Sequence, residues 1–271
     1  MDRKGFIKFN TRYSTDKSGK ASSYARAIEI LDDVLQHQNV IDFDYNSLYD
    51  VPDPDVIEKV LDLINCEVDK LKKGKPNIFD YDKQIPQSYL LKNFCSAALN
   101  SLIDYSYFEN AEDIVAKEKD PLKISKKLLK QFGLKKDGED VVYETKRRRG
   151  QEYFRRMVLE NYGNKCCVTG LDVPEILLAS HIVEWAKDKA NRLNPENGLC
   201  LSATYDAAFD KHLISFDDDY RMIVSKHIKD YYSNDVTREY FDKFEGKQIA
   251  LPSLYLPSKI LLEKHREALV G

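Results

Sequence analysis

Apolar residues recur every three or four positions along the first part of the chain. Such stretches cover residues 24–35, 56–64 and 86–103. This period places apolar side chains on one face of a helix, and Asp53 followed by proline is a typical helix start. We therefore expect residues 1–110 to form a helical domain in which the apolar stripes serve packing.

From residue 146 onward the pattern changes to short apolar runs separated by polar loops. A short β-branched run between turn residues is typical of a strand, whereas a longer run with a 3.6-residue period is typical of a helix. Ser202 is placed to cap the second helix of this region. The predicted order is a helix at 150–162, a strand over 165–170 that runs into a turn at Gly170, strands at 177–183 and 198–201, a helix at 203–210 and a hairpin over 213–224.

The stretch between these two regions is rich in Lys, Asp, Glu and Gly. Gly133 and Gly138 are candidate breakers, and residues 121–131 form a candidate lysine-rich helix. We expect residues 111–145 to connect a helical domain at 1–110 with a second domain at 146–271.

Composition narrows the class of protein. The chain has 271 residues, 42% hydrophobic and 32% charged, as in a globular protein with a solvated surface. It lacks the ~18 consecutive apolar residues that span a bilayer, and its start lacks the apolar core of a secretion signal. Cys166 and Cys167 are adjacent and there is no Cys-x-x-Cys pair, so we expect neither a disulfide scaffold nor structural zinc. A cytoplasmic protein without a membrane span is the expectation.

Charge is unevenly distributed along the chain. The net charge is −3, which excludes a uniformly basic nucleic-acid binder, yet residues 121–156 hold 12 Lys or Arg against 5 Asp or Glu. Such a run is either a solvated face or a surface that binds phosphates. The second interpretation gains weight only if a site that handles phosphate lies beside it.

The chain from about Arg147 to about Arg266 resembles the HNH endonucleases of the ββα-metal fold, and more narrowly the bacterial branch found among restriction-type and defence nucleases. The His-Ile pair, the later Asn-Gly pair and the Ala-Ala-Phe-Asp helix follow one another in the family's order. The segments that carry the resemblance are GQEYFRRMVLENYGNKCCVTG, LLASHIVEW and NRLNPENGLCLSATYDAAFDKHLISF. It implies an α+β fold, with a helical N-terminal domain followed by a ββα-metal nuclease domain.

The resemblance also implies roles for single residues. Phosphodiester hydrolysis needs a general base for water and a cation on the phosphate. His181 is the implied base, and a histidine suits this task because it is neutral near pH 7. Asn197 is implied to brace the loop and orient the base. The alternative for Asn197 is a simple Asn-Gly turn, and the two interpretations are compatible.

The implied metal site departs from the family pattern. Where relatives usually carry a metal-binding His, this chain has Asp206, next to Tyr205. Asp210 lies on the same helical face, and carboxylates suit Mg²⁺ or Mn²⁺. The alternative for both acids is a solvated helix edge. Where many such nucleases place an aspartate before the catalytic His, this chain has Ser180.

The function implied is that of a divalent-metal-dependent endonuclease hydrolysing DNA, in restriction or anti-phage defence. Cutting both strands with one site per chain favours a homodimer. Two alternatives stay open: a DNA-binding protein whose HNH domain is degenerate and inactive, and a defence effector nuclease gated by ligand sensing in its N-terminal domain. The residues expected to bind the DNA backbone are Arg147, Arg148, Arg149, Arg155 and Arg156.

Overall fold

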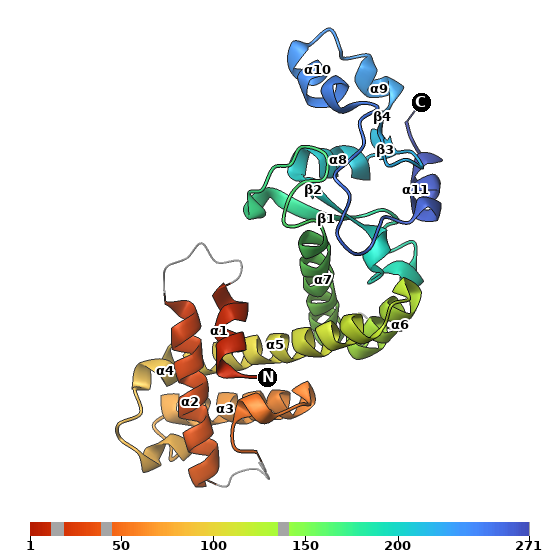
Figure 1. Cartoon of the computed structure of the whole chain (residues 1–271). Helices are drawn as coiled ribbons and strands as arrows, with labels where there is room; N and C mark the ends of the chain where they lie inside the picture. The colour runs from red at the N-terminus through yellow and green to blue at the C-terminus, as the bar shows by residue number, and fades with distance from the viewer. Residues whose placement is uncertain (12–18, 39–44, 135–140, 271) are drawn as a thin grey trace. The chain divides into compact units, whose positions relative to one another are not determined.

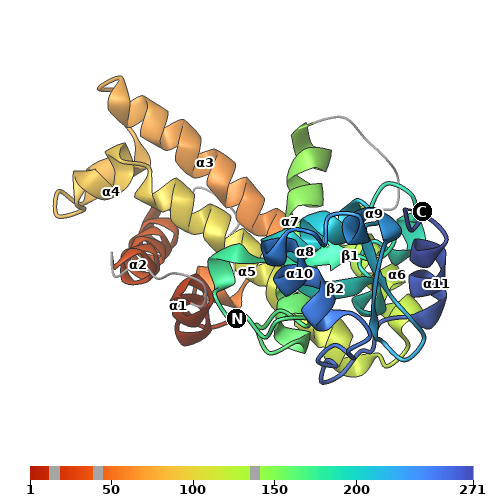
Figure 2. The same ribbon diagram turned by 90° about the horizontal axis from the view of Figure 1, so that it is seen from above.

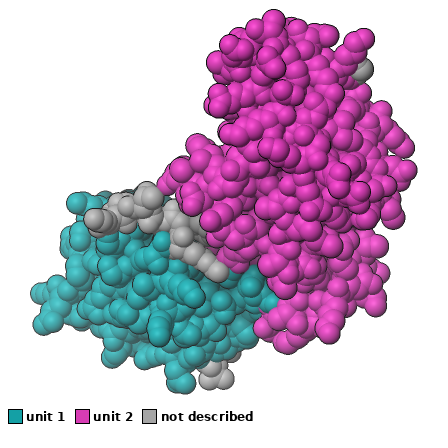
Figure 3. All heavy atoms as spheres, turned by 45° about the horizontal axis from the view of Figure 1, so that its top comes forward, with its two compact units in different colours: residues 1–112 teal, residues 113–271 magenta. Residues whose placement is uncertain are grey.

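The computed structural model describes residues 1–11, 19–38, 45–134 and 141–270. The chain divides into two compact units, Met1–Glu112 and Asp113–Gly271, which Figure 3 shows in different colours. The stretch expected to connect two domains, residues 111–145, belongs mainly to the second unit. Its described residues include a helix with buried side chains.

The first unit is helical, and its elements follow the apolar pattern. The stretches at 24–35 and 56–64 lie inside helices, and the Asp53 carboxylate caps the second of these by accepting from the Asp55 N–H at 2.9 Å. The stretch at 86–103 is divided, because Asn93 adopts a left-handed conformation (φ 60°) that ends one helix before the next begins. The elements are α1 (Arg3–Thr11), α2 (Lys20–Gln38), η1 (Leu48–Asp50), α3 (Pro54–Lys72), η2 (Ile78–Tyr81), α4 (Gln87–Leu91) and α5 (Phe94–Lys117).

The core of the first unit combines side chains of the predicted stripes with others, such as Phe6 of α1, that lie outside them. Phe6, Ile28, Leu31, Ile57 and Leu99 have no exposed surface. Burial of such side chains contributes about 1.5–3 kcal/mol each relative to exposure. The apolar pattern of this unit is therefore explained by packing.

The second unit combines helices with two small antiparallel sheets, so the α+β class is confirmed (Figure 1). Its helices are α6 (Pro121–Gln131), α7 (Val141–Asn161), α8 (Ala203–Asp210), α9 (Lys226–Lys229), α10 (Asp235–Phe241) and α11 (Lys259–Arg266). Its strands are β1 (Leu177–His181), β2 (Gly198–Ser202), β3 (Ile214–Phe216) and β4 (Met222–Val224). Short 3₁₀ turns are η3 (Pro174–Ile176), η4 (Lys189–Asn191), η5 (Pro195–Asn197) and η6 (Asp242–Phe244).

The hairpin of β1 and β2 lies between α7 and α8, both of which contact both strands (Figure 1). In the view from above, α8 lies next to the hairpin (Figure 2). His181 pairs with Gly198 at one end of the hairpin. A Cβ at Gly198 would lie 2.3 Å from Val158 Cγ2 and 3.0 Å from Phe154 Cζ, both on α7. Because Gly198 has extended backbone (φ −130°), the close approach of α7 requires this glycine rather than a left-handed turn.

One predicted strand is wrong. Residues 165–170 form turns, because the Gly170 N–H donates to the Cys166 carbonyl at 2.8 Å instead of to a neighbouring strand. Of the backbone N–H groups in this segment, that of Cys167 bonds the sheet, at the Cys200 carbonyl. All three cysteines are free and buried, and they serve as small core residues.

The remaining predictions for this unit differ less from the structure. The hairpin over 213–224 is confirmed as β3 and β4, and the lysine-rich helix is confirmed as α6. Ser202 occupies the N-cap position of α8 but makes no side-chain capping bond. None of the helices in the described residues has the length and apolarity of a membrane span.

Candidate functional site

His181 is the last residue of β1, and the contacts of its ring indicate which nitrogen carries the proton. Its ring stacks on Phe154 at 3.9 Å between centroids and meets the edge of Trp185. Nε2 lies 3.0 Å from the Arg192 carbonyl oxygen, which can only accept, so Nε2 carries the proton. Burial lowers the pKa of His181 to about 4, and the bond to Arg192 opposes this shift. The ring is therefore neutral at pH 7, with Nδ1 as an acceptor.

Asn197 braces the loop that follows His181. Its side chain is fully buried, and its Oδ1 accepts from the Val183 N–H at 2.9 Å. Its Nδ2 donates to the carbonyls of Val183 and Asn191 at 3.1 and 2.9 Å. The Ile182 N–H donates to the Asn197 carbonyl. These bonds hold the two ends of the loop together around the segment that contains Arg192.

Arg192 is a site residue that the sequence reasoning missed. It is 5% exposed, and its Nε donates to the Trp185 carbonyl at 2.8 Å while its guanidinium lies 5.3 Å from the Trp185 ring centroid. The same residue's carbonyl accepts from His181. Its side chain thus fixes the loop whose backbone orients the imidazole. The feature of the sequence that could have indicated Arg192 is its position inside the segment that resembles the HNH endonucleases.

Asp206 and Asp210 project from α8 one turn apart. The Ser180 hydroxyl donates to Asp206 Oδ1 at 2.5 Å, so the strand residue before His181 contacts the helix. Partial burial raises the pKa of Asp210, and the negative charges of Asp206 and Glu184 raise it further. The two carboxylates therefore act on one another electrostatically.

These carboxylates suit a hard divalent cation. Within the described residues, no three His, Cys, Asp or Glu side chains form a ready-made metal centre. Mg²⁺ does not require one, because it is commonly bound by one or two carboxylates together with waters and substrate phosphates. A cation there would also relieve the repulsion that raises the pKa of Asp210. The donor set fits an ion that keeps much of its water.

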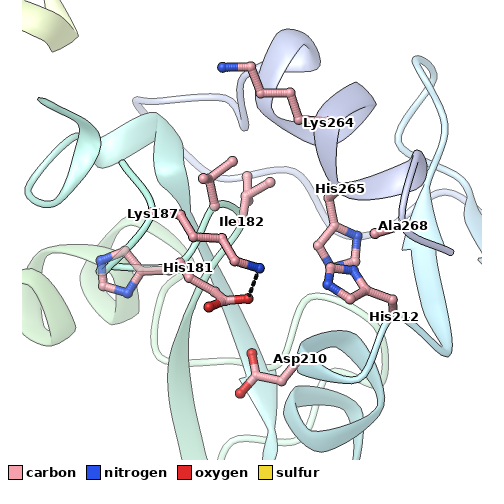
Figure 4. A pocket seen from close by; sticks show the side chains of 10 residues that line it. His181, Ile182, Lys187, Asp210, His212, Lys264, His265 and Ala268 are labelled. Carbon is pink, nitrogen blue, oxygen red and sulfur yellow. Dashed lines mark hydrogen bonds and ion pairs between the residues drawn. The ribbon is translucent and has the colours of Figure 1, made fainter. Parts of the chain in front are cut away.

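A pocket of about 170 Å³ is lined by His181 and Asp210, among other residues (Figure 4). In this view the rings of His212 and His265 face one another on the side opposite His181. Both ring nitrogens of His265 are bonded, to Ser215 Oγ at 2.9 Å and to the Phe209 carbonyl at 3.0 Å. His212 has a left-handed backbone (φ 52°), and its buried Nδ1 makes no hydrogen bond within the described structure. The lining residues also include Glu184, Lys187, Asp210 and Lys264.

Comparison with known families identifies this region. Residues 166–217 match the family model of the HNH endonucleases. The match covers the β1–β2 hairpin, α8 and β3, and it includes His181, Asn197, Asp206 and Asp210. The HNH segment supports a nuclease activity in general. No curated protein matches the chain.

The five arginines expected to bind DNA lie on α7, before the HNH segment, and their side chains have different surroundings. Arg155 donates to the carbonyls of Leu177 and Pro174 at 2.6 and 3.2 Å, which fixes the start of β1 to α7. The Arg156 side chain is only 12% exposed and lies near Glu152. Arg147 pairs with Glu144 at 2.7 Å, Arg149 is half-buried, and Arg148 is exposed. Binding of DNA by these side chains stays a prediction, and Arg155 also has a structural role.

Proposed function

We propose that this chain is a divalent-metal-dependent endonuclease that hydrolyses DNA phosphodiester bonds. The observation that carries the proposal is the neutral imidazole of His181, which lies in the HNH segment, borders a pocket and has Nδ1 as an acceptor. Hydrolysis of a phosphodiester begins with removal of a proton from water, and an oriented imidazole is suited to this step.

Proton transfer from water would depend on His181 and on the residues that hold its ring. Nδ1 of His181 takes the proton of the attacking water. The Nε2–H bond to the Arg192 carbonyl holds the ring and stabilises the imidazolium that forms. Asn197 and the Arg192 side chain keep that carbonyl in place. The ring therefore needs no rearrangement during the proton transfer.

Asp206 and Asp210 would hold the divalent ion, Mg²⁺ or Mn²⁺. When bound, such an ion neutralises charge that develops on the phosphate and the leaving oxygen. The Ser180 hydroxyl engages one oxygen of Asp206 and leaves the other for a cation. A role in restriction or anti-phage defence is part of the proposal on resemblance alone.

A second candidate is a DNA-binding protein whose HNH segment no longer cleaves. Ser180 favours it, because a neutral hydroxyl occupies the position where many such nucleases place an aspartate. This candidate predicts DNA binding without cleavage under any divalent ion.

A plasmid-cleavage assay separates the two candidates. The full chain is incubated with supercoiled plasmid in Mg²⁺, Mn²⁺ or EDTA, beside His181→Ala and Asp206→Ala. His227→Ala is the matched control, because His227 is exposed on α9 outside the pocket. We expect metal-dependent nicking that the first two substitutions reduce at least ~100-fold and the control leaves unchanged. Full activity in His181→Ala would exclude the proposed base.

A further inference from the structure

α6 presents lysines along one complete face. Lys123, Lys126, Lys127 and Lys130 are spaced three and four residues apart, so they share a side of the helix, and all four are exposed. The opposite side buries Ile124 and Leu128 completely. We call these four lysines the lysine face.

The lysine face is costly for the free protein. Like charges four residues apart destabilise a helix, and the face contains two such pairs, Lys123 with Lys127 and Lys126 with Lys130. Lys127 is compensated by Glu118 at 2.8 Å, and Lys123 has only a 4.0 Å contact with Asp120. Lys126 and Lys130 make no ion pair with any residue that the structure describes. Packing of α6 does not require a cation at these exposed positions.

The helix that carries this face is joined to the candidate site. Ser125, which is fully buried, donates from its hydroxyl to the Ala190 carbonyl in η4 at 2.6 Å. Arg192, two residues further on, supplies the carbonyl that orients His181. α6 also contacts η5, which ends at Asn197. The position of the lysine face is therefore fixed relative to His181.

A second basic segment meets the C-terminal end of α6. A Cβ at Gly133 would lie 3.1 Å from Lys146 Cδ, so the Lys146 side chain of α7 lies against the turn that follows α6. Two lysine-bearing segments that are separate in sequence are thus adjacent at this point. Ser125 contacts the loop from the buried side of α6. The lysine face is on the opposite side of the helix and is therefore separated from the loop by about 10 Å, the width of a helix.

We propose that the lysine face binds backbone phosphates of duplex DNA, at nucleotides outside those that lie at His181. The inference rests on the proposed function in taking DNA as the substrate, and it adds the surface that holds the duplex. Lysine ammonium groups neutralise phosphates without reading sequence, and each contact releases counterions. The repulsion within the face is relieved when the polyanion binds.

The test measures binding without cleavage. The full chain is titrated against a fluorescein-labelled 30-base-pair duplex in EDTA at KCl concentrations from 50 to 300 mM, with fluorescence anisotropy as the readout. We expect Lys126→Ala combined with Lys130→Ala to weaken binding about tenfold at the lowest salt. Loss of two phosphate contacts should also reduce the slope of log K against log salt by about 1.8.

A charge-reversal variant separates an effect on DNA binding from an effect on folding. Lys126→Glu places a carboxylate four residues before Lys130, which favours the helix, so the thermal midpoint should be retained or rise while binding weakens. Lys226→Glu is the matched control, since Lys226 is exposed on α9, at the other end of the unit from α6 (Figure 1). We expect this control to bind as the wild-type chain does.

The outcomes also distinguish this inference from the proposed function. Equal weakening by Lys126→Glu and Lys226→Glu overturns the lysine face, as does an absence of duplex binding or binding to RNA alone. A chain that binds duplex through Lys126 and Lys130 but never cuts plasmid refutes the nuclease and leaves the binding surface standing. If the chain cuts plasmid and its affinity for duplex does not depend on Lys126 or Lys130, the nuclease stands and the lysine face is refuted.

Discussion

The Ser180 hydroxyl donates a 2.5 Å hydrogen bond to Asp206 Oδ1 and so joins the residue before His181 to the first turn of α8. Ser180 is 3% exposed and Asp206 is half-buried, so this bond is part-buried. It fixes the side chain of Asp206 and leaves its second oxygen as an acceptor. The strand carrying the proposed base and the helix carrying the proposed ligands are thereby held together at the site.

Changing Ser180 should change how much metal the reaction needs. Ser180→Asp adds a carboxylate beside Asp206, so we expect half-maximal plasmid cleavage at a several-fold lower Mg²⁺ concentration. In EDTA the same variant should be less stable, because two like charges then lie side by side. Ser180→Ala should raise the Mg²⁺ requirement and cost about 1 kcal/mol of unfolding free energy. An Mg²⁺ requirement that is the same in all three proteins would show that this pair does not face the ion.

Removing the Arg192 side chain should impair the chemical step. Arg192→Ala leaves the carbonyl that bonds His181 but removes the contacts with Trp185 that hold it. We expect kcat to fall ~10–100-fold, because small displacements of a catalytic group are costly, with KM for plasmid nearly unchanged. Arg192→Lys retains a cation but not the planar fork and should recover only part of kcat. A proportional rise in KM with normal kcat would instead assign Arg192 to DNA binding.

Several features of the second unit could be predicted from the sequence because each depends on local spacing. The β1–β2 hairpin, α8 and the β3–β4 hairpin follow apolar runs and turn residues of standard length. The strand expected at 165–170 failed because its composition suits a strand while its backbone bonds close a local turn at Gly170. Composition alone does not reveal where an N–H finds its acceptor.

The arginines illustrate the same limit. Arg155 belongs to a basic cluster in sequence, yet its guanidinium bonds carbonyls in and next to β1. Arg192 looks like an ordinary loop arginine, yet it is buried at the candidate base. Backbone carbonyls occur at every residue and carry no sequence signature, so the partner of an arginine becomes visible only in the folded chain.

Substituting Gly198 should destabilise the unit at the end of the hairpin that carries His181. In Gly198→Ala, the added methyl group lies 2.3 Å from Val158 Cγ2, so α7 or the hairpin must move. We expect a loss of about 1–3 kcal/mol, measured by urea unfolding. Gly163→Ala is an unsuitable control because of its left-handed backbone, whereas Ala203→Gly tests a small change at the exposed start of α8. Val158 is itself buried, so Val158→Ala has its own cost; if the clash is the cause, Gly198→Ala combined with Val158→Ala should be less destabilised than the sum of the two single changes.

Stability should fall as the solution is acidified from neutral pH. His265 is 4% exposed, and burial, followed by the charge of His212, lowers its pKa to about 4 from the ordinary value near 6.5. The pKa of His181 is lowered in the same direction. Because the unfolded chain then binds more protons than the folded one, the contribution of each group is complete above pH ~6.5 and is lost as the pH falls towards 4.

Urea unfolding at pH 7.5, 6.0, 5.0 and 4.5 measures this dependence. For His265 alone the full loss amounts to about 3 kcal/mol once the pH is below both values. His265→Gln keeps an amide donor and acceptor for the Phe209 carbonyl and Ser215 but does not titrate in this range. Its free energy of unfolding should therefore decline less steeply than that of the wild-type chain, and the decline that remains includes the part that belongs to His181. An identical decline in both proteins would mean that His265 accepts its proton in the folded state as readily as in the unfolded chain.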